Sequence, residues 1–370
     1  MFSAADHAHM ARALQLAARA RYQADPNPAV GCVIVAAGHV VAEGWTAVVG
    51  GPHAERAALA AAGERARGAT AFVTLEPCCH VGRTGPCTRA LIDAGIARVV
   101  YAIDDPNPRV AGNGAAELRE ANIEVESGLL ADAAATALRG YISRRVRGRP
   151  WVRIKIAASL DGRTALANGA SRWITGDAAR ADVHRWRARS SAILTGVGTI
   201  LADDPRLDAR ADDIAWPVVQ PARVVLDSRG RMPPMAKVLQ AGGACGVFTC
   251  GARPQALDAQ AAWIEHVPAD AGGHCDLAAV LARLGEREFN DVWVEAGPTL
   301  NGALLEAGLI DELIVYSAPT VLGHASRAMF AIAQLGSMQE RIDFELDDVR
   351  RFGRDLRLIL RPTNVAGDVV

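Results

Sequence analysis

The stretches GPHAERAALA (residues 51–60) and TLEPCCHVGRTGPC (residues 74–87) decide how the first half of this chain is interpreted. The first holds a histidine two residues before a glutamate, and the second holds three cysteines. Neutral imidazole and thiolate are ligands that zinc prefers, and three protein ligands leave a fourth position for water. Zinc lowers the pKa of that water towards about 7, so hydroxide becomes available at neutral pH. The cysteines are too far apart for a tight Cys-x-x-Cys, so the sequence predicts a metal site and leaves open which cysteines bind.

The His-Ala-Glu triplet, followed downstream by Pro-Cys, is close to the pattern of zinc deaminases. In that pattern the glutamate is not a ligand but moves protons. His53 and Glu55 lie at the start of an expected helix, where both side chains would face the mouth of a pocket. Glu55 could then take the proton from zinc-bound water and deliver it to a departing amine.

The identity of the second thiolate ligand is the main question in the downstream stretch. Adjacent Cys78 and Cys79 project in different directions, which disfavours binding of both to one tetrahedral ion. Cys87, at the start of the next expected helix, is the better partner, and the HVGRTGP segment would bulge between the two ligands. Two alternatives stay open, namely a structural zinc with His80 as a fourth ligand and cysteines that only fill space.

Helices and strands alternate along the first half, which predicts an α/β layered domain with a partly parallel sheet. Cys32 lies in an apolar strand and is interpreted as a core thiol. The expected helices cover residues 1–24, 53–66, 85–95, 113–122 and 129–146, and the expected strands cover 30–38, 39–45, 69–75, 97–103 and 123–126.

The basic segment RGRP at 147–150 is the best candidate for a domain boundary, because composition changes there and a new strand, WVRIKIAAS, follows at once. The second half again alternates, with an expected helix at 177–190 and a polar, Pro-containing loop at 203–222. No GxGxxG motif follows a strand, so a Rossmann fingerprint is absent. Instead, a GPTLNG turn at 297–302 joins a strand to a helix, where backbone N–H groups can hold phosphate.

Composition narrows the function further. A chain of 370 residues with 50% hydrophobic and 22% charged residues predicts two globular domains. The net charge of -1 gives no long-range attraction for nucleic acid, and the arginines crowded at 139–153 are interpreted as a solvated helix end plus linker.

No apolar run is long enough for a membrane span, and the N-terminal segment lacks the apolar core of a signal peptide. Seven cysteines in a chain of this size favour thiols and metal ligands over disulfides, so we expect a cytoplasmic enzyme.

Four segments, PNPAVGCVIV, GPHAERAAL, TLEPCCHVGRTGPC and DDPNPRVAGNG, resemble the deaminase domain of the bifunctional riboflavin-biosynthesis deaminase/reductase family. The resemblance covers residues 1 to about 145 and implies a cytidine-deaminase-like, three-layer α/β fold. It also implies that zinc hydroxide replaces a ring amino group of a phosphoribosylamino-pyrimidine by oxygen. The family usually has Ser where this chain has Cys79. Carried over by motif, the zinc ligands are His53, Cys78 and Cys87, the proton shuttle is Glu55, and Asn27 is a pocket position that can contact the pyrimidine edge. Arg83, in the loop between the ligands, is expected to bind the substrate phosphate because a guanidinium suits phosphate oxygens, with a solvent-exposed loop arginine as the alternative.

In the second half, KIAASLDGRTA, SRWITG, ILTGVGTILADDPRLDAR, VVLDSRGRMP and VWVEAGPTLNGALLEAGLIDELIVYSAP resemble the reductase domain of the same family. The match runs from about 151 to 325, and only generic strand patterns follow it. It implies a dihydrofolate-reductase-like fold, NADPH as hydride donor, and reduction of a ribosyl to a ribityl chain. The cofactor positions would be Ala157, Trp173, Thr199, Asp203, Ser228, Gly297, Pro298, Thr299, Leu300, Asn301, Gly302 and Ala303. The substrate positions would be Ser171, Arg187, Leu207, Arg210 and Glu295, with the arginines suited to phosphate.

Lys155 and Asp161 are candidates for proton handling at the reacting carbon, with a snorkelling strand residue and a turn residue as the alternatives. His184 is expected to be packed or surface-exposed and not a ligand.

We therefore expect a deaminase domain at 1–146 and a reductase domain at 147–370, with zinc and NADPH as cofactors and a small phosphorylated pyrimidine as substrate. A homo-oligomer is left open.

Two other hypotheses are a nucleoside or tRNA deaminase with an RNA-binding appendage, and a non-catalytic, metal-stabilised nucleotide-binding module. The first is disfavoured because Lys+Arg (40) barely match Asp+Glu (41), and the second because Glu55 and Glu295 are both present.

Overall fold

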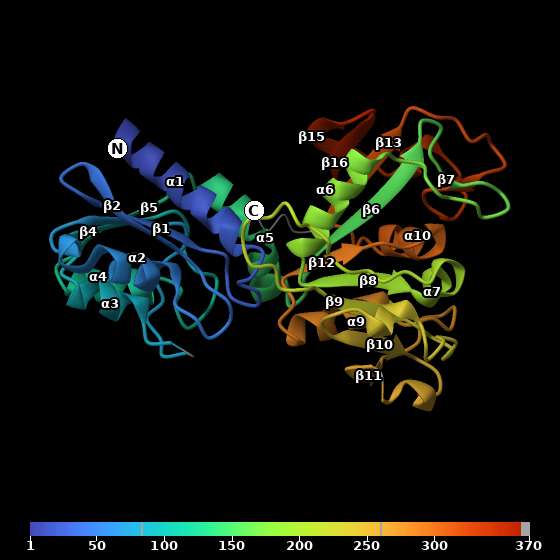
Figure 1. Cartoon of the computed structure of the whole chain (residues 1–370), viewed down its shortest axis with the longest axis horizontal. Coiled ribbons are helices and arrows are strands. Elements are labelled where there is room, and N and C mark those ends of the chain that lie inside the picture. Colours follow the sequence, from blue (N-terminus) through green and yellow to red (C-terminus); the bar gives the residue numbers. More distant parts are fainter. Residues whose placement is uncertain (83, 260, 364–370) are drawn as a thin grey trace. The chain divides into compact units, whose positions relative to one another are not determined.

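The computed structural model describes residues 1–82, 84–259 and 261–363 (Figure 1). These residues divide into two compact units, Met1–Gly148 and a second that begins at Arg149. The division falls within the RGRP segment, where α5 ends at Arg147 and β6 starts at Trp151. Each unit has its own sheet and its own core.

The first unit is built on a five-stranded sheet in the order β2-β1-β3-β4-β5. Strand β1 pairs antiparallel with β2 and with the central strand β3, whereas β3, β4 and β5 run parallel, so the sheet is mixed as expected. Its elements are α1 (Ala4–Ala20), β1 (Gly31–Ala36), β2 (His39–Trp45), α2 (Ala54–Ala62), η1 (Gly63–Ala66), β3 (Thr70–Val73), α3 (Cys87–Asp93), β4 (Arg98–Tyr101), α4 (Asn113–Glu120), β5 (Glu124–Ser127) and α5 (Ala131–Arg147).

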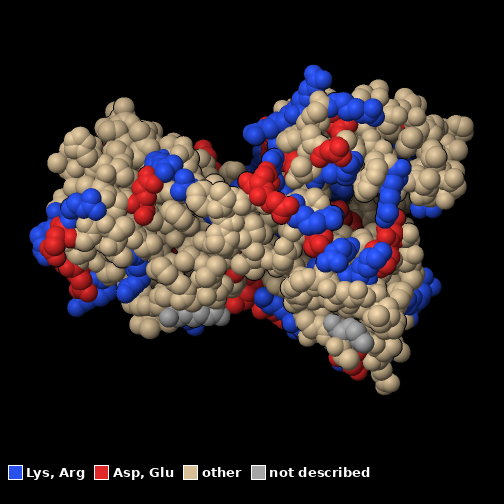
Figure 2. Space-filling model, viewed as in Figure 1, with Lys and Arg blue, Asp and Glu red and all other residues tan. Residues whose placement is uncertain are grey.

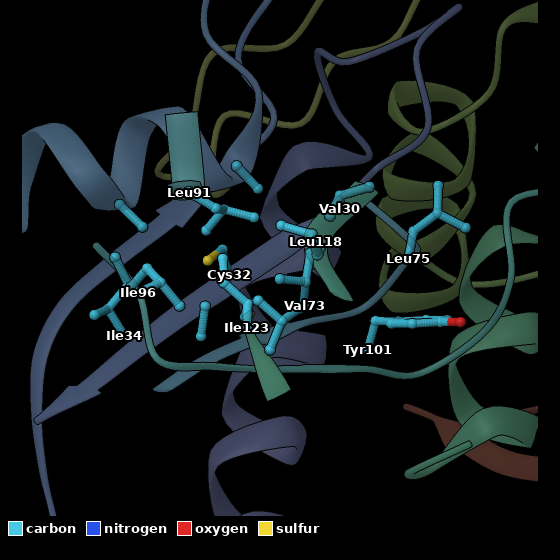
Figure 3. Close-up of a cluster of buried hydrophobic side chains, with 14 of the residues drawn as sticks. Val30, Cys32, Ile34, Val73, Leu75, Leu91, Ile96, Tyr101, Leu118 and Ile123 are labelled. Atoms are coloured by element: carbon cyan, nitrogen blue, oxygen red, sulfur yellow. The ribbon is translucent and has the colours of Figure 1, made fainter. Parts of the chain in front are cut away.

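Apolar side chains leave both faces of this sheet, because successive residues of a strand point to opposite sides. On one face Val33 and Phe72 pack with Met10 and Leu16 of α1. On the other face Cys32, Ile34 and Val73 pack with residues of α2, α3 and α4 (Figure 3). Helices thus cover both sides of the sheet, which confirms the three-layer prediction. Cys32 is fully buried in the second of these clusters, as predicted for a core thiol.

Gly44 in β2 allows α2 to lie unusually close to the sheet. A Cβ atom at this position would stand 2.3 Å from the carbonyl oxygen of Ala54 and 2.5 Å from the nitrogen of Ala58. Any larger residue would therefore push the start of α2 away from the strand. This close approach matters because His53 and Glu55 lie at that end of the helix.

The second unit is built on a nine-stranded sheet in the order β11-β10-β9-β8-β12-β6-β13-β16-β15. The strands from β11 to β13 are parallel to their neighbours, and β16 and β15 are antiparallel. The elements are β6 (Trp151–Ser159), β7 (Arg163–Ala165), α6 (Asp177–Ala188), β8 (Ala192–Gly196), α7 (Val197–Asp203), β9 (Ala222–Leu226), α8 (Lys237–Gln240), β10 (Cys245–Thr249), η2 (Gln255–Leu257), β11 (Trp263–His266), α9 (Leu277–Glu286), β12 (Asp291–Val294), α10 (Pro298–Glu306), β13 (Glu312–Ala318), β14 (Arg327–Ala328), η3 (Met338–Glu340), β15 (Phe344–Phe352) and β16 (Asp355–Pro362).

The two faces of this sheet are also both covered. Val292 and Val294 of β12 pack in a cluster with α9 and α10, whereas Trp293 packs in a second cluster with Trp186 of α6. The generic strand patterns expected after residue 325 form the β15–β16 hairpin, which extends the sheet beyond β13. The loop predicted at 203–222 agrees with the structure, since the described chain has no helix or strand between α7 and β9.

Three of the arginines at 139–153 differ from the expectation of a solvated end, whereas Arg145 is exposed as expected. Arg144 is 8% exposed and donates to the carbonyl oxygen of Pro26 at 3.0 Å. Arg149 forms two hydrogen bonds to the Asp311 carboxylate, at 2.7 and 2.9 Å, and the buried Arg153 is paired with both Asp291 and Glu312. These side chains stabilise the fold and form no open basic surface. On the face in Figure 2, basic and acidic groups are intermixed.

No helix among the described residues combines the length and the apolar character needed to cross a bilayer.

Candidate functional sites

His53, Cys78 and Cys87 meet in the first unit. Their ligand atoms all lie within 4.8 Å of one another. The Nδ1 atom of His53 is 3.5 Å from Sγ of Cys78 and 3.4 Å from Sγ of Cys87. One imidazole and two thiols at this spacing suit zinc, and three ligands leave a coordination position for water. The residues present therefore fit the predicted ion.

The wide spacing of the two cysteines has a local cause. Cys78 follows β3, and Cys87 is the first residue of α3, directly after Pro86. The carbonyl oxygen of Cys78 accepts hydrogen bonds from the backbone N–H groups of Cys87 and Thr88, at 2.9 and 3.2 Å. The first N–H groups of a helix have no partner within it, so Cys78 satisfies them. These hydrogen bonds hold Cys78 beside the start of α3, so the two thiols lie close together although their cysteines are far apart in the sequence.

The two thiols affect each other's ionisation. The pKa of Cys78 is lowered, chiefly by its contact with the Cys87 thiol, with His53 adding to the effect against the opposing influence of burial. The pKa of Cys87 is raised by the same contact and by burial. Since thiols bind a metal ion as thiolates, zinc binding here would release protons.

Glu55 is the second residue of α2, beside this cluster, and is 4% exposed. Burial raises its pKa to about 7, with the negative charge of Cys78 adding to the effect and His53 opposing it. A carboxyl group with a pKa near neutrality can both accept and release a proton at physiological pH. Glu55 is not among the clustered ligand residues, so the arrangement separates metal binding from proton transfer.

Cys79 points away from the cluster. Its Sγ atom donates to the carbonyl oxygen of Arg109 at 3.4 Å. His80 is also absent from the group of clustered ligand atoms, which the described residues limit to His53, Cys78 and Cys87. The alternative of a closed, four-ligand structural site thus has no support in the described part of the chain.

We expect Cys79→Ser to leave bound zinc and the deamination rate within about twofold of the wild type, since a hydroxyl can still donate to the Arg109 carbonyl oxygen. Zinc content by plasma mass spectrometry and ammonia release would test this. Loss of zinc in this variant would contradict the ligand assignment.

Two further residues, Asn27 and Arg83, are predicted to contact the substrate in the first site. Asn27 lies half-buried in the turn between α1 and β1, and its backbone N–H donates to the carbonyl oxygen of Ala24 at 2.9 Å. Arg144 holds the same turn through Pro26. Arg83 lies outside the described residues.

In the second unit, Lys155, Arg187 and Glu295 form one cluster. Lys155 is on β6, and Glu295 follows the neighbouring strand β12. The Glu295 carboxylate accepts from Nε and Nη2 of Arg187 at 2.6 and 2.9 Å and from Nε1 of Trp293 at 2.8 Å, and it lies 3.7 Å from Nζ of Lys155. Although burial opposes ionisation, the charges of Arg187 and Lys155 hold the pKa of Glu295 well below its usual range.

This pairing differs from the expectation that Arg187 holds a phosphate. Two of its nitrogens are bonded to Glu295, and its Nη1 donates to the carbonyl oxygen of Asp208 at 3.0 Å. Three of its five N–H groups are thus engaged within the protein, two of them by a carboxylate that lies 108 positions away in the sequence. Arg187 therefore orients Glu295 and the loop at 208.

We expect Glu295→Ala to destabilise the second unit by about 3 kcal/mol, because it leaves the buried Arg187 charge uncompensated. Differential scanning calorimetry would show the transition of this unit shifted to lower temperature while that of the first unit stays in place. An unshifted transition would mean that the pair is not structurally important.

Asp161 is committed to a turn. Its carboxylate accepts from Oγ of Ser159 at 2.5 Å and from the backbone N–H groups of Leu322 and Gly323 at 3.1 and 2.8 Å. These hydrogen bonds, that of Ser159 first, lower its pKa to about 2. An acid of this strength neither holds nor readily takes a proton at neutral pH, so the geometry disfavours the proposed proton handling and favours the alternative of a turn residue.

Several predicted cofactor positions gather at one edge of the sheet. Ser228 follows β9, Thr199 follows β8 within α7, and Gly297 follows β12 as the N-cap of α10. These strands are parallel neighbours, so their carboxyl ends meet at the same edge, where ligands bind in open α/β sheets. Ala157 lies on β6, the next strand. The exposed positions Asp203 and Trp173 also belong to this half, and Arg180 lies 4.4 Å from the centre of the Trp173 ring.

The run from Gly297 to Ala303 divides into two parts. Gly297 and Thr299 are exposed at the start of α10, with Pro298 between them. By contrast, Asn301 is buried and donates to the carbonyl oxygens of Ala296 and Met329 at 3.3 and 3.4 Å. A Cβ atom on Gly302 would stand 2.1 Å from the carbonyl oxygen of Ala331. These last two residues thus anchor the helix, and only its first turn offers exposed backbone to a ligand.

The remaining substrate positions lie before α6 and in the loop after α7. Ser171 is half-buried, Leu207 is 3% exposed, and Arg210 is exposed with its Nε atom 3.5 Å from the Asp208 carboxylate. His184 of α6 contacts Arg210, so it is packed against the loop as expected. Gln220 also binds this loop, and no sequence pattern predicts it, because the contact depends on how the loop folds back.

Two family models match this chain. The model described as the RibD C-terminal domain matches residues 150–358, and that described as the cytidine and deoxycytidylate deaminase zinc-binding region matches residues 3–103. Riboflavin biosynthesis protein RibD of Escherichia coli (strain K12) is 46% identical over 368 residues, covering 96% of this chain and 99% of that protein. The protein of the same name from Haemophilus influenzae is 43% identical, covering 98% and 99%.

Solved structures agree. The structure described as Acinetobacter baumannii RibD, form 1, superposes with a TM-score of 0.89 at 45% identity, covering 97% of this chain and 99% of that one. The Thermotoga maritima structure described as a diaminohydroxyphosphoribosylaminopyrimidine deaminase/5-amino-6-(5-phosphoribosylamino)uracil reductase gives 0.85 at 33% identity, with the same coverage. The resemblance inferred from the motifs is thus found along almost the entire chain.

Proposed function

Because the chain belongs to the RibD family of riboflavin-biosynthesis proteins, we propose that the two clusters described above are its deaminase and reductase sites. The chain is a bifunctional enzyme with a zinc-dependent deaminase and an NADPH-dependent reductase. It deaminates diaminohydroxyphosphoribosylaminopyrimidine to 5-amino-6-(5-phosphoribosylamino)uracil with release of ammonia, and then reduces the ribosyl chain to ribityl. The hypothesis of an RNA-binding appendage is wrong, since the second unit matches the RibD C-terminal domain.

The observation that carries the deaminase assignment is the convergence of His53, Cys78 and Cys87 beside the buried Glu55. Zinc held by these three residues would supply hydroxide at neutral pH. Glu55 accepts the proton of the attacking water on a carboxylate oxygen and delivers it to the amine as the amine leaves. Asn27 and Arg83 are proposed to hold the pyrimidine edge and the phosphate.

For the reductase, we assign the nicotinamide nucleotide to the sheet edge formed by Ala157, Thr199, Ser228 and the first turn of α10. NADPH supplies the hydride. The backbone N–H groups at the start of α10 suit a phosphate of the cofactor. Lys155, 3.7 Å from Glu295, is the proposed donor of the proton that the ribosyl ring oxygen takes up when its bond to the hydride-accepting carbon breaks. Asp203 and Trp173 complete the proposed cofactor site, and Ser171, Leu207 and Arg210 that for the substrate.

A two-step assay tests the function and its order. Zinc-loaded protein given the diaminopyrimidine substrate should release ammonia without NADPH and should consume NADPH only after ammonia appears. Ammonia can be followed by a coupled dehydrogenase assay, and NADPH by its absorbance. If neither step occurs in zinc-loaded protein, the assignment is refuted.

We further propose a small-molecule substrate, with no nucleic-acid or membrane partner, and action in the cytoplasm. Basic and acidic groups are intermixed on the face in Figure 2, and no described helix is long and apolar enough to cross a membrane. Both observations support this proposal. A homo-oligomer remains open, and analytical ultracentrifugation would measure its size.

A further inference from the structure

We propose that His184 and Gln220 are positioning residues of the reductase site, which fix the backbone of the loop carrying Leu207 and Arg210 without touching the substrate. The inference rests on the proposed function of that loop. Neither residue belongs to the predicted cofactor or substrate positions. Both lie outside the loop's tip, His184 on α6 and Gln220 shortly before β9.

The loop has no helix or strand, yet its backbone is bound at three successive residues. Arg187 Nη1 donates to the carbonyl oxygen of Asp208 at 3.0 Å. Gln220 binds both polar groups of Ala209, since its Nε2 donates to the carbonyl oxygen at 2.8 Å and its Oε1 accepts from the N–H at 3.0 Å. His184 Nδ1 accepts from the N–H of Arg210 at 3.1 Å. Side chains here replace the backbone partners that a strand would provide.

The conformation at Leu207 shows why such bonds are needed. Its φ angle is +50°, in the left-handed region that a bulky residue rarely adopts, and its side chain is 3% exposed. A residue in this region persists only where surrounding contacts impose it, at a cost of about 1–3 kcal/mol. The bonds to Ala209 and Arg210 follow directly in the chain, so they hold the backbone that leaves Leu207.

The chemistry of the imidazole leaves the Arg210 side chain available. A neutral imidazole has one acceptor nitrogen and one N–H. With Nδ1 accepting from the Arg210 backbone, Nε2 carries the hydrogen and cannot accept from Nη2 of Arg210, which lies 3.1 Å away. His184 therefore binds the backbone of Arg210 and not its guanidinium, which is exposed and can turn to an anionic group of a ligand.

The surroundings of His184 keep its imidazole neutral, the form in which Nδ1 can accept a hydrogen bond. Burial lowers its pKa to about 4, and the positive charges of Arg187 on its own helix and of Arg210 on the loop add to this, against the opposing charges of Glu295 and Asp208. The ring is consequently neutral at physiological pH. This supports the acceptor role that the distances indicate.

The test compares His184→Ala and Gln220→Ala with the wild type in the full, zinc-loaded chain. For each variant we expect the KM for 5-amino-6-(5-phosphoribosylamino)uracil to rise about fivefold or more, the effect of one lost hydrogen bond on binding. The KM for NADPH, the kcat of reduction and the rate of ammonia release should stay within about twofold. Hydrogen exchange of the 204–214 backbone should become faster.

Two further variants separate positioning from general damage. His184→Gln keeps an acceptor and should restore most of the substrate affinity. Arg185→Ala removes the neighbouring exposed ion pair of α6 with Asp213, and its KM should match the wild type.

An unchanged substrate KM in both alanine variants would overturn the inference, as would an equal rise in the KM for NADPH. A wild type that releases ammonia but never consumes NADPH would instead overturn the proposed reductase function, and the inference with it.

Discussion

Replacement of Glu55 by Gln should slow deamination about a thousandfold, the typical contribution of a positioned general acid–base. The amide has almost the same shape but can neither accept the proton of the attacking water nor return it to the leaving amine. The side chain is 4% exposed, so solvent cannot easily substitute for it. Ammonia release under single-turnover conditions would measure the loss.

Three controls belong to this experiment. Zinc content should be unchanged, because Glu55 is outside the ligand group. Reduction of separately prepared 5-amino-6-(5-phosphoribosylamino)uracil should proceed at the wild-type rate, because that site lies in the other unit. Glu64→Gln, at an exposed position of η1, should have no effect on either step. A near-normal deamination rate in Glu55→Gln would remove Glu55 from the mechanism.

Replacement of Cys87 by Ser should lower zinc affinity by more than about 100-fold, since even outer-shell changes at such sites cost about 10–100-fold. Deamination should be lost with the metal. The thiol is fully buried and lies 3.4 Å from Nδ1 of His53, within the group of clustered ligand atoms. Mass-spectrometric zinc content and ammonia release would be measured on the same preparation.

Cys79→Ser is the matched control for this variant, because it changes an adjacent cysteine of the same loop in the same way. Treatment of the wild type with a chelator should reproduce the Cys87→Ser result and be reversed by added zinc. Neither treatment should alter NADPH consumption with separately prepared 5-amino-6-(5-phosphoribosylamino)uracil as the substrate. If Cys79→Ser lost zinc while Cys87→Ser retained it, the ligand set would have to be redrawn.

The chemistry of the zinc site could be predicted because it depends on residue types and on short spacings in the sequence. His53 and Glu55 share one helix turn, and a proline precedes each of the two ligating cysteines. Such patterns depend on local geometry, which is set by neighbouring residues and not by contacts with distant parts of the chain. The alternating apolar segments likewise indicated most strands, because a strand must present side chains to both faces of a covered sheet.

The roles within the reductase half were harder to predict. Arg187 and Asp161 were interpreted from residue type, as a phosphate ligand and a proton carrier. In the structure, Arg187 is occupied by Glu295, and Asp161 binds a turn near residue 322. A charged side chain looks the same in the sequence whether it faces a ligand or a partner of opposite charge.

The sequence alone thus determined the family, the two-domain α/β organisation, the zinc ligands and the proton carrier as a hypothesis. Only the tertiary structure decided which cysteine stands apart and which charges are internally paired. It also decided that His184 and Gln220 hold the loop beside Arg210. The physical reason is that these contacts join residues far apart in the chain, such as Arg187 and Glu295 at a separation of 108 positions. Their energy depends on distance in space, which periodicity and motif spacing do not encode.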